Sequence, residues 1–136
     1  FLDLEKLLNR HVAKFVKFLE MDINPKELKM SSCWVNVMSK GVTHAMHIHP
    51  LSTISGTMYI DLPKGSPGIK FEDPRQVNFM ASPPRKSNAR TENQRFFILQ
   101  PKVGDVVLFE SWMRHEVPVN QGKQNRISVS FNYDWR

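Results

Sequence analysis

Three histidines in one short stretch are the first sign of chemistry in this sequence. The stretch is "HAMHIHP", residues 44–50, in a chain of 136 residues that holds five histidines. Neutral imidazole is the commonest protein ligand of transition metals, and it also titrates near neutral pH. If the stretch is an extended strand, His47 and His49 point to one side and His44 points to the other. His47 and His49 are therefore candidate ligands of one metal ion, and Pro50 is expected to end the strand.

A third imidazole follows much later in the chain. In "GDVVLFESWMRH", an apolar segment and an aromatic turn lead to His115. Strands that are distant in sequence face each other across a β-sandwich, so His115 could complete a three-histidine metal site. Two histidines at this spacing are also common on protein surfaces, and the residues alone leave both readings open. His11, which has polar neighbours, is expected at the surface.

The last strand-like segment, "RISVSFNYDW", combines an apolar face with a polar face that begins at Arg126. A buried guanidinium needs an anion, and a carboxylate satisfies it with two parallel hydrogen bonds. Ser128 lies on the same face and could donate a further hydrogen bond. The alternative is an exposed edge strand with a solvated arginine.

The elements that must position these residues begin with a helix. In "LDLEKLLNRHVAKFVKFLEM", apolar residues recur at steps of three and four. Pro25 disfavours helical geometry at the residue before it, so the helix must end by that point. We therefore expect a leading helix over residues 1–24.

Short strands are expected after this helix. Six segments are rich in β-branched and aromatic residues and are bounded by turn residues: "CWVNVMS", "SGTMYIDLP", "RFFILQP", "DVVLFE", "HEVPV" and "RISVSFNY". No second helical pattern separates them, and the long polar segment 76–95 predicts a surface loop insertion. The expected fold is mainly β, a single domain over residues 1–136. It has a jelly roll at 33–135 with the N-terminal helix packed against it.

Composition limits the partners and the compartment. The net charge of +6, from 19 basic and 13 acidic residues, permits an anionic partner such as nucleic acid without requiring one. The single cysteine, Cys33, excludes an internal disulfide and favours a reducing, cytoplasmic location. No apolar run approaches the roughly 18 residues of a membrane span, so no membrane association is expected.

Taken together, these motifs resemble a known family. The order of HxH, "SGTMY", "GDVVLF", histidine and "RIS" is similar to the double-stranded β-helix, a cupin-like jelly roll, of iron(II)- and 2-oxoglutarate-dependent oxygenases. Within the prolyl-hydroxylase-like branch, a group with the pattern "HxHP…SG…Y…DPR" is most similar, seen here as "HIHPLSTISGTMYI" and "IKFEDPR". The resemblance covers Trp34 to Trp135 and includes the 11-residue step from His115 to Arg126 (126 − 115).

The resemblance implies an iron(II) site. His47 and His115 would be the two histidine ligands. Most members carry a carboxylate two residues after the first histidine, whereas this sequence has His49 there. Either His49 is the third ligand, or Asp73 of "FEDPR" replaces it, or water or halide fills that position.

The resemblance also implies 2-oxoglutarate and dioxygen as cosubstrates. Arg126 and Ser128 would hold the distal carboxylate of 2-oxoglutarate, and Tyr59 or Asn36 would hydrogen-bond the cosubstrate. The implied activity is that of a dioxygenase, a hydroxylase that couples oxidative decarboxylation of 2-oxoglutarate to oxidation of a substrate.

The substrate is not encoded in any motif. Arg75 and Trp112 are candidate substrate contacts, and the basic residues of the 76–95 insertion are compatible with an anionic substrate or with a solvated loop. A small molecule and a protein side chain are both open, nucleic acid is not excluded, and the oligomeric state is undetermined.

Two other functions fit some of these residues. A cupin-like metal-dependent enzyme that does not use 2-oxoglutarate would suit the histidines equally, but it would not need Arg126 to bind a cosubstrate. In a non-catalytic β-sandwich binding module, replacing His47 or His115 would leave the amount of bound metal at the wild-type level, even where that level is zero.

Overall fold

A computed structural model describes residues 2–75 and 80–135 of the chain. The N-terminal element is α1 (Leu2–Phe18), and a short 3₁₀ helix, η1 (Pro25–Glu27), follows it. The strands are β1 (Leu28–Met38), β2 (His44–His47), β3 (Ile54–Asp61), β4 (Ile69–Glu72), β5 (Phe96–Leu99), β6 (Val106–Glu110), β7 (His115–Val117) and β8 (Arg126–Trp135). A second 3₁₀ helix, η3 (Thr91–Asn93), precedes β5.

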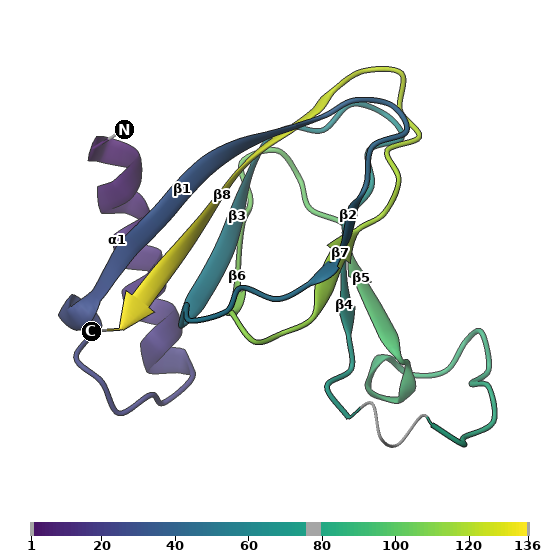
Figure 1. Ribbon diagram of the computed structural model, residues 1–136, viewed down its shortest axis with the longest axis horizontal. Coiled ribbons are helices and arrows are strands. Elements are labelled where there is room, and N and C mark those ends of the chain that lie inside the picture. Colours follow the sequence, from purple (N-terminus) through teal and green to yellow (C-terminus); the bar gives the residue numbers. More distant parts are fainter. Residues whose placement is uncertain (1, 76–79, 136) are drawn as a thin grey trace.

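The strands form two antiparallel sheets of four strands each. The first sheet has the order β1-β8-β3-β6 and the second has the order β2-β7-β4-β5. In Figure 1 the first sheet lies between α1 and the second sheet. Successive strands lie in opposite sheets except β4 and β5, which pair with each other in the second sheet. This arrangement is a jelly roll, and the predicted mainly β architecture is confirmed.

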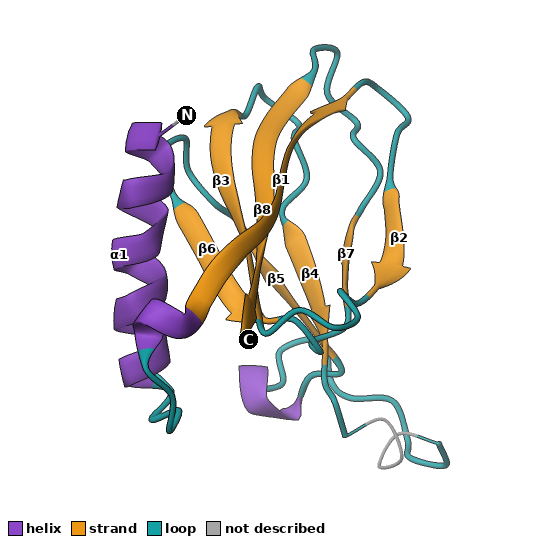
Figure 2. Ribbon diagram, turned by 60° about the vertical axis from the view of Figure 1, so that its left-hand side comes forward, coloured by secondary structure: helices purple, strands orange, loops and turns teal. Residues whose placement is uncertain are grey.

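The helix covers the outer face of the first sheet (Figure 2). Its buried residues Leu8, Val12 and Val16 recur every four positions, which places them on one stripe of the helix. The stripe packs against sheet residues that include Phe131 and Tyr133. These contacts make the outer layer the larger apolar core, so the inner face of the same sheet remains available for a site.

The predicted leading helix is shorter than residues 1–24. It ends at Phe18, where the amide of Met21 donates to the carbonyl of Val16 at 3.2 Å. Glu20, at φ 54°, donates to the carbonyl of Lys17 at 3.1 Å. These two bonds form a Schellman motif, which satisfies the last helical carbonyls and turns the chain before η1. His11 is exposed on this helix, as predicted.

Strand β8 passes through the centre of the molecule with its two faces in different environments. Phe131 and Tyr133 point to the helix layer, whereas Arg126 and Ser128 are buried on the opposite face, between the two sheets. The predicted separation of an apolar face and a polar face in this strand is confirmed. The interior of the roll therefore carries polar side chains where an apolar core would ordinarily be found.

Some elements differ from the expectation. β1 begins at Leu28, before the predicted segment at Cys33. The strand expected over the histidine stretch, with its end at Pro50, is the four-residue β2 and already ends at His47, and β4 is a four-residue strand for which no segment was predicted. Strands this short carry too few residues to show an alternating pattern. In the predicted insertion, residues 76–79 lie outside the described part of the chain, and the remainder contains η3 but no strand. None of the described helices is long and apolar enough to cross a membrane.

Candidate metal and cosubstrate site

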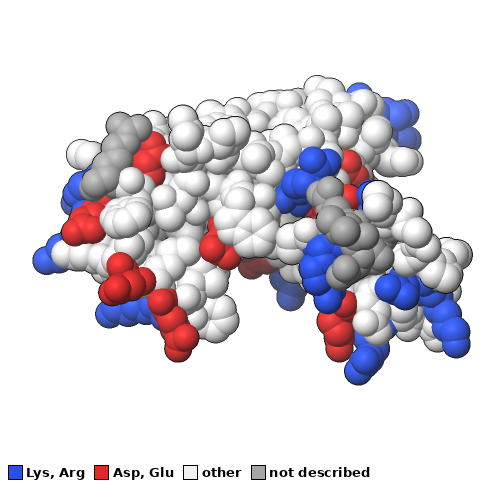
Figure 3. All heavy atoms as spheres, turned by 60° about the horizontal axis from the view of Figure 1, so that its bottom comes forward, with Lys and Arg blue, Asp and Glu red and all other residues white. Residues whose placement is uncertain are grey.

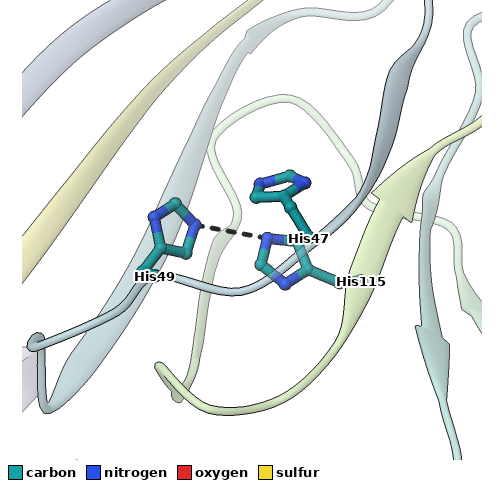
Figure 4. Close-up of side chains that lie close together, drawn as sticks. All are labelled: His47, His49 and His115. Atoms are coloured by element: carbon teal, nitrogen blue, oxygen red, sulfur yellow. Dashed lines mark hydrogen bonds between the residues drawn. The ribbon is translucent and has the colours of Figure 1, made fainter.

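Three histidines meet between the two sheets. His47 ends β2 and lies directly opposite His115, the first residue of β7. His49 follows β2 in a turn whose backbone is held by the Ser111 carbonyl, which accepts from the His49 amide at 3.0 Å. One ring nitrogen from each of the three imidazoles lies within 4.8 Å of the others. Figure 4 shows the three rings converging from these two strands and the turn.

Backbone carbonyls fix the orientation of two of the rings. Nδ1 of His47 donates to the Ala45 carbonyl at 2.6 Å, and Nδ1 of His115 donates to the Met113 carbonyl at 2.8 Å. A carbonyl oxygen can only accept, so the proton lies on Nδ1 and the lone pair lies on Nε2. This is the second-sphere arrangement that metal-binding histidines ordinarily have.

The separation of the ring nitrogens fits a shared ion. Nε2 of His49 lies 3.3 Å from Nε2 of His115. Two nitrogens that each lie about 2.1 Å from one ion, at an angle between octahedral and tetrahedral values, are about 3.0–3.4 Å apart. Imidazole ligands suit iron, zinc, copper and nickel, so the donor set fits a divalent transition metal.

The environment favours the neutral imidazoles that a metal requires. The pKa of His115 is lowered to about 4, chiefly by burial; the Met113 carbonyl opposes the shift, and His47 and His49 add to it. Burial, and then the nearby His47, also lower the pKa of His49. At neutral pH both side chains therefore present lone pairs instead of positive charges.

His44 lies on the same side as these rings, and the prediction that it points the other way is wrong. In the antiparallel pair of β2 and β7, His44 lies opposite Val117 and His47 lies opposite His115. Three steps along β2 thus match two steps along β7, so β2 contains a bulge with one extra residue. The bulge breaks the alternation that the prediction assumed, and it returns His44 to the face of His47.

The histidines line a cavity of about 220 Å³ between the sheets. The four imidazoles of His44, His47, His49 and His115 form part of its wall, and side chains from the inner face of the first sheet form another part: Trp34, Asn36, Thr57 and Ser130. Asn36 donates to the Ser130 hydroxyl at 2.8 Å and accepts from Trp34 Nε1 at 3.1 Å. The predicted cosubstrate residue Asn36 therefore borders the cavity within a hydrogen-bonded network.

Arg126 is buried beyond this wall, with 1% of its surface exposed. Its Nε donates to the Pro67 carbonyl at 3.2 Å, and one terminal nitrogen donates to the Ser128 hydroxyl at 3.2 Å. Within residues 2–75 and 80–135, no carboxylate forms an ion pair with it. A buried guanidinium is costly without an anion, so this part of the interior is suited to a carboxylate ligand.

Tyr59 adds a second unsatisfied group beside Arg126. It lies on β3 opposite Ser128, and its ring centre is 5.1 Å from the guanidinium carbon. Its buried hydroxyl has no hydrogen-bond partner with acceptable geometry among the described residues. Burial raises the pKa of Tyr59 to about 12, against the opposing effect of Arg126. A neutral phenol that can donate a hydrogen bond is thus available to a bound anion.

The remaining predicted residues lie outside the histidine cluster. The Asp73 carboxylate accepts hydrogen bonds from the side chain of Arg75, including one from Nε at 3.0 Å, and these bonds lower the pKa of Asp73. Asp73 borders a separate, largely apolar groove of about 480 Å³, and Arg75 is exposed. Trp112 lies in the turn between β6 and β7 with 52% of its surface exposed.

The predicted insertion contributes charge to one side of the molecule. Arg85, Lys86 and Arg90 are exposed in the β4–β5 connection. Figure 3 shows basic side chains gathered on the half of the surface that carries this connection. The net positive charge of the chain is therefore partly concentrated there.

Solved structures of several enzymes share this fold. An oxidoreductase of the 2OG-Fe(II) oxygenase family from Burkholderia pseudomallei has a TM-score of 0.69 at 16% identity, over 97% of this chain and 58% of that chain. A prolyl-4-hydroxylase from Pseudomonas putida has a TM-score of 0.53 at 15% identity, over 76% and 51% of the two chains. The epimerase SnoN from nogalamycin biosynthesis, in complex with Fe³⁺, alpha ketoglutarate and nogalamycin RO, has a TM-score of 0.58 at 15% identity. That match covers 79% of this chain and 50% of SnoN.

The chain thus spans 50–58% of the length of these structures, and the likeness at such identities concerns the fold. A search of curated protein sequences finds no match. A family model described as "Putative 2OG-Fe(II) oxygenase" matches residues 32–132, which include all four histidines of the cavity and Arg126. The chain belongs to this family of 2OG-Fe(II) oxygenases.

Proposed function

We propose that the protein is an iron(II)- and 2-oxoglutarate-dependent dioxygenase that hydroxylates or otherwise oxidises a substrate. The observation that carries this proposal is the placement, inside one jelly roll, of three convergent imidazoles and a buried Arg126 that forms no ion pair with a carboxylate of the described residues. Iron, 2-oxoglutarate and dioxygen, when bound, would supply the oxidising chemistry: one oxygen atom of dioxygen would enter the succinate that 2-oxoglutarate yields on losing carbon dioxide, and the other would oxidise the substrate. The residues of the chain hold, orient and shield these groups.

The iron ligands in this proposal are His47, His49 and His115. The close approach of the His49 and His115 nitrogens favours His49 as the third ligand. Asp73 is disfavoured because its carboxylate is bound by Arg75 and lies outside the histidine cluster. Three neutral ligands leave both positive charges of iron(II) uncompensated, so an anionic cosubstrate would be attracted strongly to this site.

The cosubstrate residues in this proposal are Arg126, Ser128, Tyr59 and Asn36. Arg126 and the unpartnered Tyr59 hydroxyl would bind the distal carboxylate, with Ser128 orienting the guanidinium. Asn36, in the cavity wall, would lie beside the 2-oxo acid end of 2-oxoglutarate. The SnoN structure, which contains Fe³⁺ and alpha ketoglutarate in a similar fold, supports 2-oxoglutarate as the cosubstrate.

The substrate is proposed to approach over the β6–β7 turn. The Ser111 carbonyl in this turn accepts a hydrogen bond from the His49 amide, and His115 is the first residue after the turn. A molecule bound at the turn would therefore be close to the proposed metal. Trp112 offers an exposed aromatic surface there. Arg75 is a second candidate contact, although its side chain is engaged by Asp73.

The first test is an anaerobic titration of the metal-free protein with iron(II) and then with 2-oxoglutarate. A weak visible charge-transfer band should form only when both are present, because it arises from the iron chelate of the 2-oxo acid. The Arg126→Gln variant, checked for folding by thermal unfolding, should bind iron normally but require much more 2-oxoglutarate. Iron binding without a band would favour a cupin-like enzyme that does not use 2-oxoglutarate. Absence of iron binding would contradict the metalloenzyme altogether.

A further inference from the structure

We propose that His44 is a cosubstrate-binding residue that donates a hydrogen bond to the distal carboxylate of 2-oxoglutarate beside Arg126. The inference rests on the proposed function above, and it adds a residue that the sequence pattern placed on the wrong side of the strand. Its basis is the bulge in β2, which turns His44 into the cavity.

His44 lies between the metal-binding end of the cavity and Arg126. It borders the cavity together with His47 and Ser130, and Ser130 shares the inner face of β8 with Arg126. The electrostatic environment agrees with this position: burial, and then the charges of Arg126 and His47, lower the pKa of His44. A ligand that extends from the histidine cluster to the guanidinium would therefore pass His44.

The ring of His44 is available for a ligand. His47 of β2 and His115 of β7 each use Nδ1 for a hydrogen bond to a backbone carbonyl. His44 makes no hydrogen bond to any residue that the structure describes. Its distance from the other ring nitrogens also leaves it outside the three-histidine cluster. A neutral imidazole always carries one N–H donor, which a carboxylate can accept.

The backbone that presents His44 is fixed on both sides. The Thr43 hydroxyl donates to the Val117 carbonyl at 2.8 Å, which ties the start of β2 to β7. Asn120 is fully buried, and its backbone carbonyl accepts a hydrogen bond from the Gly41 amide at 2.8 Å. The side-chain amide of Asn120 donates a hydrogen bond to the Met38 carbonyl at 2.8 Å. Met38 is the register partner of Arg126, so one network positions both His44 and the guanidinium.

The test compares 2-oxoglutarate binding to His44→Phe and His44→Gln with binding to the wild-type protein. Affinity is read from the charge-transfer band of the iron complex under anaerobic conditions, and iron affinity is measured separately by competition with a chelator. His44→Phe keeps a ring without a donor and should weaken 2-oxoglutarate binding about tenfold. His44→Gln restores an N–H donor and should recover part of that loss. The exposed His11→Phe on α1 is the matched control and should change neither affinity.

The outcomes separate this inference from the proposed function. If the wild-type protein forms no band with iron(II) and 2-oxoglutarate, the proposed function fails, and the inference fails with it. If the band forms but His44→Phe binds 2-oxoglutarate as the wild type does, only the role of His44 is overturned. A loss of iron affinity in His44→Phe without added 2-oxoglutarate would instead identify His44 as a metal ligand and would also overturn the inference.

Discussion

The Nε2 atoms of His49 and His115 lie 3.3 Å apart, although 66 positions separate the two residues in the sequence. The jelly roll produces this contact because β2 and β7 are neighbours in the second sheet. His47 is drawn into the same cluster by its pairing with His115. A histidine cluster built in this way depends on strand pairing, so the fold itself brings the three imidazoles together.

Replacing His49 tests whether it is the third ligand. His49→Ala should weaken iron(II) binding at least about tenfold, since it removes one of three donors, and even outer-sphere partners contribute about 10–100-fold to metal affinity. His49→Glu should retain iron, because a glutamate carboxylate reaches about as far from its Cα as histidine Nε2 and adds a compensating negative charge. Iron affinity is measured anaerobically by competition with a chelator. Equal affinity of His49→Ala and wild type would show that His49 is not a ligand.

Tyr59→Phe separates a cosubstrate contact from a structural one. The Tyr59 hydroxyl has no hydrogen-bond partner in the described chain, so its removal should leave the free energy of unfolding of the metal-free protein unchanged or slightly higher. Binding of 2-oxoglutarate should weaken about tenfold or more, because a hydrogen bond to a charged group contributes about 1.5–3 kcal/mol. Titration of the charge-transfer band and urea unfolding give the two measurements.

The control for this experiment is Tyr133→Phe. The Tyr133 hydroxyl donates to the side chain of Asn9 at 2.6 Å, on the helix side of the first sheet. Its loss should lower the free energy of unfolding by about 1 kcal/mol without affecting 2-oxoglutarate. A Tyr59→Phe protein that is destabilised but binds 2-oxoglutarate normally would assign Tyr59 a purely structural role.

The sequence predicted the polar stripe of β8 correctly and the orientation of His44 incorrectly, and the two strands show why. β8 pairs on both sides along its length, with β1 and β3, so residues such as Arg126 and Ser128 follow a regular alternation. β2 is a four-residue edge strand with a bulge. A bulge depends on pairing with β7, which no local pattern encodes.

The candidate site was predictable to a similar extent. Histidines at a spacing of two suggest a shared ion, and one ring nitrogen of His47 does lie within 4.8 Å of one of His49. The involvement of Asp73 was not predictable, because the hydrogen bonds that its carboxylate accepts from the nearby Arg75 are seen only in the folded chain. The unpartnered state of the Tyr59 hydroxyl is also a property of packing, and only the assembled sheets reveal it.

Gly56 in the "SG" motif makes room for the helix-side core. A Cβ added to Gly56 would lie 2.5 Å from two ring atoms of Phe131 and 2.7 Å from a methyl group of Leu108. Gly56→Ala should therefore lower the free energy of unfolding by about 1–3 kcal/mol through overpacking. Combined with Phe131→Leu, the cost should be smaller than the sum of the two single changes, because they share one contact. Strict additivity in urea unfolding would contradict this explanation.

Glu72 should make stability depend on pH in the acidic range. Its side chain is buried and accepts hydrogen bonds from Arg114 at 2.8 Å and from Arg95 at 3.0 Å. Burial acts to raise the pKa of Glu72, but the two guanidinium groups lower it on balance. A lowered folded-state pKa stabilises the protein above the ordinary glutamate pKa of about 4.3, and this contribution is lost as pH falls through the lowered value.

Glu72→Gln should thus lower the free energy of unfolding by about 1–3 kcal/mol at pH 7. The difference from wild type should shrink below about pH 4. Glu92→Gln, in an exposed pair with Arg90, should show neither effect, and a pH-independent cost of Glu72→Gln would mean that its charge is unimportant.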